Sequence, residues 1–87
     1  MDQTLKVMAD GTRYWYSNGL LHRTDGPAIE YCTGTSHWMQ NGLLHRVDGP
    51  AVEDRRGDHE WWINGVQLTE SQFDQVYAQR MDQAALT

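Results

Sequence analysis

Hydrophobic and polar side chains alternate over short stretches of this chain, and glycine-containing turns separate the stretches. Alternation with a period of two predicts half-buried β-strands. The whole pattern returns every 23 residues without a gap, and this self-similarity predicts a repeat architecture. The positions that carry the period are Trp15, Trp38 and Trp61, the pairs Asn18-Gly19, Asn41-Gly42 and Asn64-Gly65, and Gly11, Gly34 and Gly57.

Each unit is expected to form a β-hairpin followed by a corner. Asn-Gly is the preferred pair for a two-residue type I′ turn, because both central positions need a positive φ. Pro27 and Pro50 have no N–H to donate to a neighbouring strand, so we expect them at corners or strand starts. Successive units keep the same orientation only if each contributes an even number of strands. We therefore expect two main strands per unit, with residues 21–27 and 44–50 as a connection or short edge strand.

The alternation also predicts where the core lies. Side chains alternate between the two faces of a strand, so the repeated tryptophans Trp15, Trp38 and Trp61 are expected on one side of the sheet. Tryptophan buries a large area, and few other large apolar side chains recur in every unit. We therefore expect these three indoles to form the core.

The last unit departs from the first two after Asn64-Gly65. Thr69 followed by Gln72 is a possible capping box. A helix from about residue 70 to about residue 84 is expected, with an apolar face that covers the end of the sheet. The residues at helical spacing are Phe73, Val76, Tyr77 and Met81.

The predicted fold class is therefore mainly β, an antiparallel sheet of three tandem 23-residue β-hairpin repeats with one C-terminal α-helix. The repeats are expected at about 5–27, 28–50 and 51–69, within one domain that spans residues 1–87.

Composition narrows the classes of function. Seven basic and twelve acidic residues give a net charge of −5, which disfavours nucleic-acid phosphates and suits a basic partner surface. The single cysteine, Cys32, cannot form an internal disulfide, which fits a reducing compartment. Residues 1–10 show no secretory signal, and no apolar stretch is long enough to cross a bilayer. We expect a cytoplasmic protein with no membrane partner.

The sequence Trp-Met-Gln-Asn-Gly-Leu-Leu-His-Arg-Val-Asp-Gly-Pro-Ala at 38–51, with its counterpart at 15–28, carries a resemblance. It resembles the Trp-x-x-Asn-Gly-x-Leu-His-Arg-x-Asp-Gly-Pro-Ala repeat of many small bacteriophage and giant-virus proteins, and is loosely similar to MORN-type β-hairpin repeats. The likeness runs from about residue 5 to about residue 73. It implies a phage accessory protein in the host cytoplasm, and many such proteins bind and block a host component.

His22 and His45 occupy equivalent positions and are the first candidates for metal binding or catalysis. With two strands per unit they would lie about 10 Å apart, given a strand spacing of about 4.8 Å. Two ligands of one zinc ion need nitrogens within about 4 Å of each other. We therefore expect no metal and no cofactor. Each histidine is expected to hydrogen-bond a turn backbone, while Arg23 pairs with Asp25 or Asp48.

Other chemical candidates also have structural explanations. Cys32 is expected in a strand, packed or half-exposed, because no activating base lies near it in the sequence. Glu30 and Glu53 recur with the unit, which indicates a solvated strand face rather than an acid–base pair. No phosphate-binding loop, zinc-ligand spacing or Ser-His-Asp order is present. We expect no catalytic residues and no enzyme activity.

Residues that differ between units are the candidates for recognition, since repeated residues build the scaffold. Aromatic residues and methionine are enriched in interfaces, and they are expected on the face opposite the tryptophans. A unit-specific acidic cluster surrounds the turn at 55–57. The expected partner-binding residues are Tyr14, Tyr16, Met39, Asp54, Asp58, Glu60 and Trp62.

These observations favour a phage-encoded protein that inhibits a host protein by direct contact, for instance a nucleic-acid-binding defence complex such as a CRISPR effector. Its exposed strand edges would also allow a homodimer. Two alternatives stay open. A nucleic-acid-binding protein would combine stacked aromatic residues with basic residues. In a variant of this alternative, the acidic surface would mimic DNA and occupy a nucleic-acid site on a host protein. An enzyme would use His22 and His45. The basic residues that the nucleic-acid-binding alternative would use are Arg13, Arg23, Arg46, Arg55 and Arg56.

Overall fold

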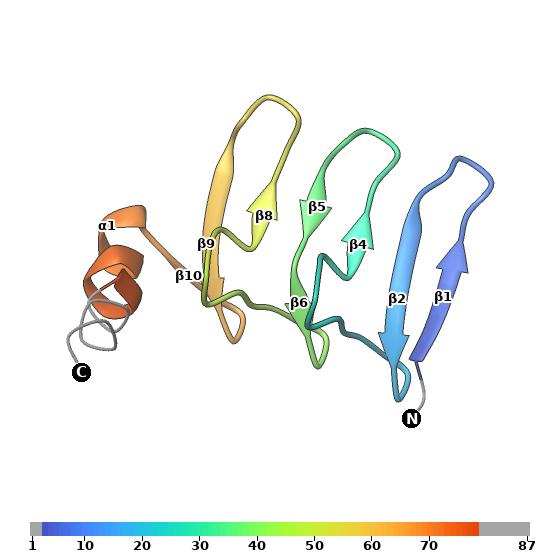
Figure 1. Ribbon diagram of the computed structural model, residues 1–87, viewed down its shortest axis with the longest axis horizontal. Helices are drawn as coiled ribbons and strands as arrows, with labels where there is room; N and C mark the ends of the chain where they lie inside the picture. The colour runs from blue at the N-terminus through green and yellow to red at the C-terminus, as the bar shows by residue number, and fades with distance from the viewer. Residues whose placement is uncertain (1–2, 79–87) are drawn as a thin grey trace.

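The computed structural model describes residues 3–78 and shows a mainly β chain with antiparallel sheets and one short C-terminal helix (Figure 1). The strands follow one another in a row, with the first strand at one end and the helix at the other. The strands are β1 (Gln3–Val7), β2 (Arg13–Ser17), β3 (Leu20–Leu21), β4 (Ile29–Glu30), β5 (Ser36–His37), β6 (Met39–Gln40), β7 (Leu43–Leu44), β8 (Val52–Glu53), β9 (His59–Ile63) and β10 (Val66–Leu68), followed by α1 (Glu70–Phe73) and the π-helical segment η1 (Asp74–Ala78).

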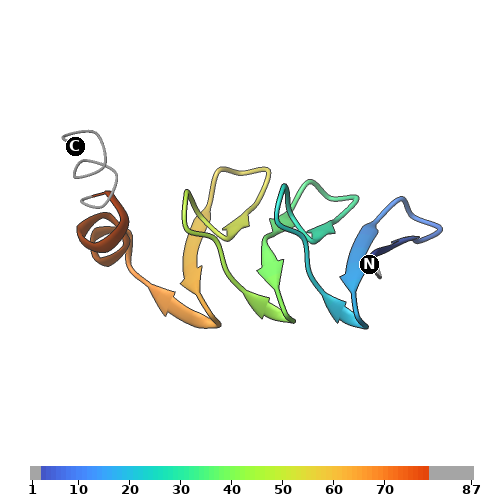
Figure 2. The same cartoon turned by 60° about the horizontal axis from the view of Figure 1, so that its bottom comes forward.

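The sheet order is β1-β2-β4-β5-β8-β9-β10, with β3 paired to β2 and with β6 and β7 paired to each other. The outer edge of β2 is shared by two neighbours. Its first two residues pair with β4, and its last two pair with β3. Two ladders therefore run along the row, one through the long hairpins and one through the Asn-Gly turns, and Figure 2 shows these turns side by side along one margin.

The Asn-Gly turns have the backbone that the sequence predicts. Asn18, Asn41 and Asn64 have φ angles of 51°, 52° and 48°, and the glycines that follow have φ angles of 79°, 80° and 79°. Positive φ at both central residues is the requirement of a type I′ turn. Short strands follow the first two turns, and connections at 22–28 and 45–51 lead to the next hairpin.

Hydrogen bonds between successive hairpins recur at an offset of 23 residues. The amide of Gly42 donates to the carbonyl of Leu21 (2.8 Å), and that of Gly65 donates to Leu44 (2.9 Å). One residue earlier in each turn, an asparagine amide donates to a histidine ring of the preceding hairpin. These bonds join Asn41 N to His22 Nδ1 and Asn64 N to His45 Nδ1, both at 3.0 Å.

The buried residues are mostly small, and this corrects the expected tryptophan core. Ala28 and Ala51 are fully buried, whereas Trp15, Trp38 and Trp61 are half-buried. Within residues 3–78, a row of hairpins measuring 46 × 34 × 21 Å has no second layer that could enclose large rings (Figure 2). The tryptophan backbones instead pair with the alanines, since Trp15 N donates to Ala28 O (2.8 Å) and Trp38 N donates to Ala51 O (2.6 Å).

The C-terminal helix begins at the predicted capping box. Gln72 N donates to Thr69 Oγ1 (3.1 Å), and Thr69 N donates to Gln72 Oε1 (2.9 Å). Phe73 is buried, with its ring 6.4 Å from that of Trp61. Val76 is exposed, contrary to expectation, because the segment from Asp74 is π-helical and does not keep the 3.6-residue period. The rest of the predicted helix to about residue 84, including Met81, lies outside the described residues, as does the side chain of Tyr77.

Gly65→Ala should lower the free energy of unfolding more than Gly19→Ala. Both glycines have a φ of +79°, so an alanine in this left-handed conformation should lower stability by the same amount, about 1–2 kcal/mol, at each position. A Cβ at Gly65 would also lie 3.3 Å from Leu43 Cδ2, whereas a Cβ at Gly19 meets nothing within 4 Å. Urea denaturation of the two variants measures the difference. Adding Leu43→Ala should bring the cost of Gly65→Ala down to that of Gly19→Ala, and an unchanged cost would contradict the packing of Leu43 on this turn.

Candidate protein-binding face

The two faces of the long-hairpin ladder carry different chemistry. Directly paired residues of antiparallel strands project to the same face, so the register defines two rows. We call the side with the first row the arginine face and the side with the second row the tyrosine face. The first row is Arg13, Glu30, Ser36, Glu53 and His59, and the second row is Tyr14, Ile29, His37, Val52 and Glu60.

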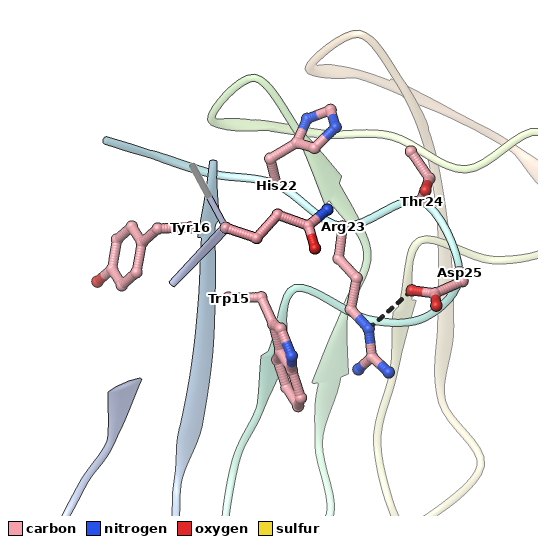
Figure 3. A pocket seen from close by; sticks show the side chains of 7 residues that line it. Trp15, Tyr16, His22, Arg23, Thr24 and Asp25 are labelled. Atoms are coloured by element: carbon pink, nitrogen blue, oxygen red, sulfur yellow. Dashed lines mark hydrogen bonds and ion pairs between the residues drawn. The ribbon is translucent and has the colours of Figure 1, made fainter. Parts of the chain in front are cut away.

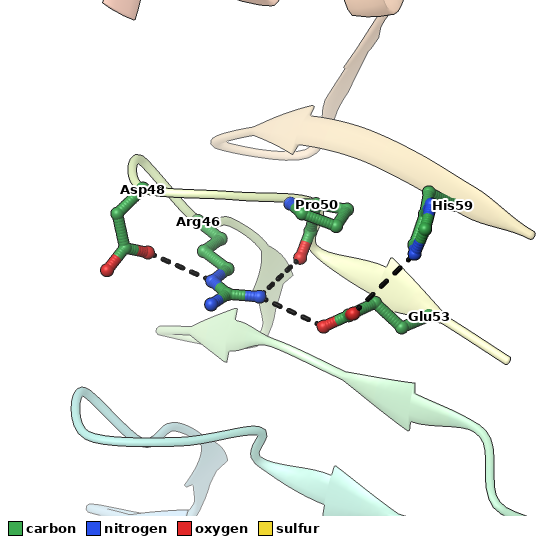
Figure 4. Close-up of polar contacts among 5 residues, drawn as sticks. All are labelled: Arg46, Asp48, Pro50, Glu53 and His59. Atoms are coloured by element: carbon green, nitrogen blue, oxygen red, sulfur yellow. Dashed lines mark hydrogen bonds and ion pairs between the residues drawn. The ribbon is translucent and has the colours of Figure 1, made fainter. Parts of the chain in front are cut away.

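On the arginine face, Arg46 holds the Asp-Gly-Pro corner of its own hairpin (Figure 4). Its Nε donates to Asp48 Oδ1 (2.9 Å), and its Nη1 donates to Pro50 O (3.1 Å) and to Glu53 Oε1 (3.0 Å). The guanidinium carbon lies 3.8 Å from the ring centroid of Trp38. The arginine therefore covers the indole and satisfies the corner at the same time.

Arg23 makes the same contacts in the preceding hairpin (Figure 3). Its Nε donates to Asp25 Oδ1 (3.0 Å), its Nη1 donates to Pro27 O (3.2 Å), and its guanidinium carbon lies 4.0 Å from the Trp15 centroid. Of the two partners that the sequence allowed, Asp25 is the one that binds. A Cβ at Gly26 would lie 2.8 Å from Arg23 Cζ, so close approach of the guanidinium requires the glycine.

The remaining chemical candidates have structural roles or none. His22 and His45 bind turn amides, as predicted. Across residues 3–78, no group of three or more His, Cys, Asp or Glu residues is placed to hold a metal ion. Cys32 lies exposed in the turn after β4 rather than in a strand, and its amide donates to Thr12 Oγ1 (3.2 Å).

The two repeated glutamates are ion-paired rather than merely solvated. Glu30 lies 3.6 Å from Arg23 Nη1 and 3.7 Å from Arg13 Nη1. Glu53 binds Arg46 and lies 3.7 Å from His59 Nε2. Pairing with an arginine explains why a carboxylate stands at this position in two successive hairpins.

A small cavity opens between the first hairpin and its corner, with a volume of about 210 Å³ (Figure 3). Its charged and imidazole groups already have partners, because Arg23 binds Asp25 and His22 accepts from the amide of Asn41 in the next turn. This cavity therefore follows from the scaffold and offers little free chemistry. Its lining residues are Gln3, Trp15, Tyr16, His22, Arg23, Thr24 and Asp25.

The tyrosine face carries a continuous aromatic cluster. The rings of Tyr14 and Tyr16 are stacked with centroids 6.4 Å apart, and Tyr14 meets Tyr31 edge-on at 6.4 Å. Tyr31 in turn meets His37 edge-on at 5.1 Å. All four are half-buried, so each ring presents an apolar surface and a polar group to solvent.

Partial burial changes the ionisation of this cluster. Desolvation lowers the pKa of His37, and the charge of Glu60 opposes this change. Desolvation also raises the pKa of Tyr31, with a smaller contribution from Tyr14. The face is thus largely uncharged where the rings gather and becomes acidic towards Glu60.

The strand register brings five of the seven predicted partner-binding residues to this face. Tyr14 and Glu60 lie in its defining row, and Tyr16 and Trp62 follow them by two residues on β2 and β9. Met39 begins β6 two residues after His37 and pairs with Leu44 as Tyr16 pairs with Leu21. Trp62 Nε1 donates to Glu60 Oε1 (2.9 Å).

The other two residues, Asp54 and Asp58, lie in the turn between β8 and β9. Asp54 Oδ1 accepts from the amides of Arg56 and Asp58, both at 2.9 Å, so Asp54 shapes the turn. Asp58 is exposed. The acidic cluster therefore divides into a structural aspartate and two accessible carboxylates, those of Asp58 and Glu60.

Two residues of the aromatic cluster were missed by the sequence reasoning. His37 and Tyr31 are not among the partner-binding residues that the sequence predicts. Position 37 is the counterpart of Tyr14 and Glu60, and position 31 is the counterpart of Asp54. Applying the 23-residue spacing to the candidates themselves would have found both.

Comparison of the chain with known protein families, with curated protein sequences and with solved structures finds no match. Among residues 3–78, no helix is long and apolar enough to span a membrane.

Arg46→Ala should destabilise the fold by about 2–3 kcal/mol, because it removes charged hydrogen bonds and the contact with Trp38 together. Arg46→Lys should recover only a small part of this loss, since lysine lacks the planar fork of donors. Arg56→Ala is the matched control at an exposed arginine and should change stability by less than about 0.5 kcal/mol. Urea denaturation measures all three, and equal effects of Arg46→Ala and Arg56→Ala would contradict the assigned role.

Stability should depend on the protonation of His37. Its pKa is lowered on folding, so the unfolded chain binds a proton that the native chain excludes. Stability is then complete above the usual histidine pKa of about 6.5 and is lost as the pH falls from there towards the lower native pKa. Urea denaturation between about pH 5 and pH 8 should show this slope in the native chain and a shallower slope in His37→Gln. Identical slopes would mean that His37 is not desolvated on folding.

Proposed function

We propose that this chain is an array of three tandem 23-residue β-hairpin units that acts as a small phage-encoded inhibitor, binding a host protein through its tyrosine face. The main support is that one face repeats its contacts from hairpin to hairpin and the other face varies its residues. Contacts on the arginine face recur in successive hairpins, which marks them as scaffold. Residues on the tyrosine face change from one hairpin to the next, and such changes fit recognition of a particular partner.

The change along the tyrosine face suggests the chemistry of that partner. Reading from the first hairpin to the third, one position carries Tyr14, His37 and Glu60. Two residues further along each strand, the series is Tyr16, Met39 and Trp62. Tyrosine, tryptophan and methionine are enriched at interfaces. The complementary surface would therefore be apolar along most of its length and basic where it meets Glu60 and Asp58.

A basic host surface also fits the net charge of −5, because opposite charges speed association. Surfaces of this kind are common on nucleic-acid-binding proteins, so a defence complex such as a CRISPR effector is the partner class we propose. We propose direct contact as the mode of inhibition, without catalysis and without a cofactor, in the host cytoplasm.

Direct binding of nucleic acid is less well supported. Three of the five arginines in the predicted basic patch are engaged with carboxylates, namely Arg13, Arg23 and Arg46. Arg55 and Arg56 are exposed, but they lie in the turn that also holds Asp54 and Asp58. Phosphate contacts dominate nucleic-acid affinity, and this turn offers little net positive charge.

Affinity capture from a host lysate tests the proposal. The native chain should retain one partner in stoichiometric amount, and Tyr16→Ala or Trp62→Ala should weaken binding of the purified partner about tenfold or more, as expected for aromatic residues that anchor an interface. Leu20→Ala, at an exposed residue on the opposite face, is the matched control and should bind normally. Retention of no partner, or equal loss in all three variants, would argue against the tyrosine face as the binding surface.

A further inference from the structure

The row of hairpins has an open strand edge at each end. Strand β1 pairs with β2 on one side, and no strand within residues 3–78 lies on its other side. At the opposite end, β9 pairs with β8 along its inner edge and with β10 along the second half of its outer edge. The outer edge of β9 at His59 and Glu60 is therefore uncovered within the described residues.

The junctions between neighbouring hairpins inside the row, which we call internal junctions, show which strand covers the equivalent edge. The first half of β2 is covered by β4, with Tyr14 opposite Ile29 and Trp15 N donating to Ala28 O. The first half of the next long strand is covered by β8 in the same register, with Trp38 N donating to Ala51 O. The counterparts of β4 one period earlier in the sequence, and of β8 two periods earlier, are Lys6 and Val7 of β1.

We propose that the open edge of β9 receives β1 of a second copy of this chain, so that copies associate head to tail. The register of the internal junctions then fixes the pairs. Glu60 lies opposite Lys6 of the second copy, His59 lies opposite Val7, and the amide of Trp61 donates to the carbonyl of Leu5.

The side chains at this junction are complementary. Lys6 is the only lysine in the chain, and it forms no ion pair among the described residues. The junction places it on the same face as Glu60, directly across the strands, where opposite charges attract. Leu5 and Val7 are 50% and 59% exposed on this edge strand, and the junction brings Leu5 beside Trp61.

The space beside β9 is open to a strand. A groove of about 360 Å³ lies between the outer edge of β9, strand β10 and the first turn of α1. Helix α1 ends only the ladder of Asn-Gly turns. In that ladder Arg23 N and Arg46 N each donate to a carbonyl of the next hairpin, whereas their counterpart Thr69 N donates to Gln72 Oε1. Among the residues that the structure describes, nothing ends the long-hairpin ladder at β9. The groove is lined by His59, Glu60, Trp61, Gln67, Leu68, Thr69, Glu70 and Gln72.

Because the two surfaces differ, the contact is heterologous and does not close on itself as a two-fold dimer does. It therefore replaces the homodimer expected from the sequence with an open series of copies. Few residues meet at each junction, so the association is weak and depends on concentration. The tyrosine face continues across each junction.

Sedimentation velocity of the purified protein tests this proposal without any host component. The native chain should shift from monomer to larger species as its concentration rises. Lys6→Glu and Glu60→Lys should each weaken association about tenfold, because each places like charges opposite each other. The double variant Lys6→Glu/Glu60→Lys restores opposite charges and should recover native association. A monomer at every concentration would overturn the proposal, as would a double variant no better than the single ones.

Backbone substitution at β1 gives a second measurement. Amides alternate in direction along a strand, and Met8 N donates to Thr12 O across the hairpin, so Val7 N faces the open edge. Val7→Pro should remove that donor and abolish association, whereas Val7→Ala, which keeps the amide, should associate nearly as the native chain does. Thermal unfolding checks that Val7→Pro is folded, and if it is not, the charge reversal decides. Association that is unaffected by a folded Val7→Pro would overturn the proposal.

Discussion

The stacking of an arginine on a tryptophan is the interaction on which the rest of this structure depends. The part of the chain that the structure describes forms a row of hairpins with no second layer, so ordinary burial cannot hold a large ring in place (Figure 2). The guanidinium of Arg46 supplies the missing cover for Trp38. Its donors would be costly to leave unpaired there, so the corner that follows provides Asp48 and the carbonyl of Pro50 as acceptors.

This arrangement explains why so many residue types recur together. The aspartate pairs with the arginine, the glycine leaves room for the guanidinium, and the proline carbonyl accepts from the guanidinium. The histidine before the arginine holds the next turn through its Nδ1 atom. The ring proton must then be on Nε2, which fixes the tautomer. Alanine recurs because its carbonyl accepts a hydrogen bond from the tryptophan amide at a fully buried position, which has room only for a small side chain.

Much of the local structure was predictable from the sequence because turn chemistry acts over a few residues. The Asn-Gly turns, the capping box at Thr69 and the histidine contacts follow from short-range rules. The half-burial of the tryptophans was not predictable in this way, since it depends on the absence of a second layer over the sheet. The exposure of Val76 depends on a local change of helix geometry that its hydrophobic spacing does not reveal. The tyrosine face was partly predictable, because side-chain alternation assigns Tyr14 and Trp62 to a face but not the ring contacts of Tyr31 and His37.

The recurrence of the inter-hairpin hydrogen bonds at a fixed offset also bears on how such a protein changes over time. Each hairpin forms hydrogen bonds only with its neighbours among the described residues. Duplication of the gene segment that encodes 23 residues would therefore add one hairpin inside the row and leave both ends unchanged. Under the proposed function, copy number would set the width of the surface that meets the partner, and substitutions away from the arginine stack would set its chemistry. The width and the specificity of that surface could then evolve independently.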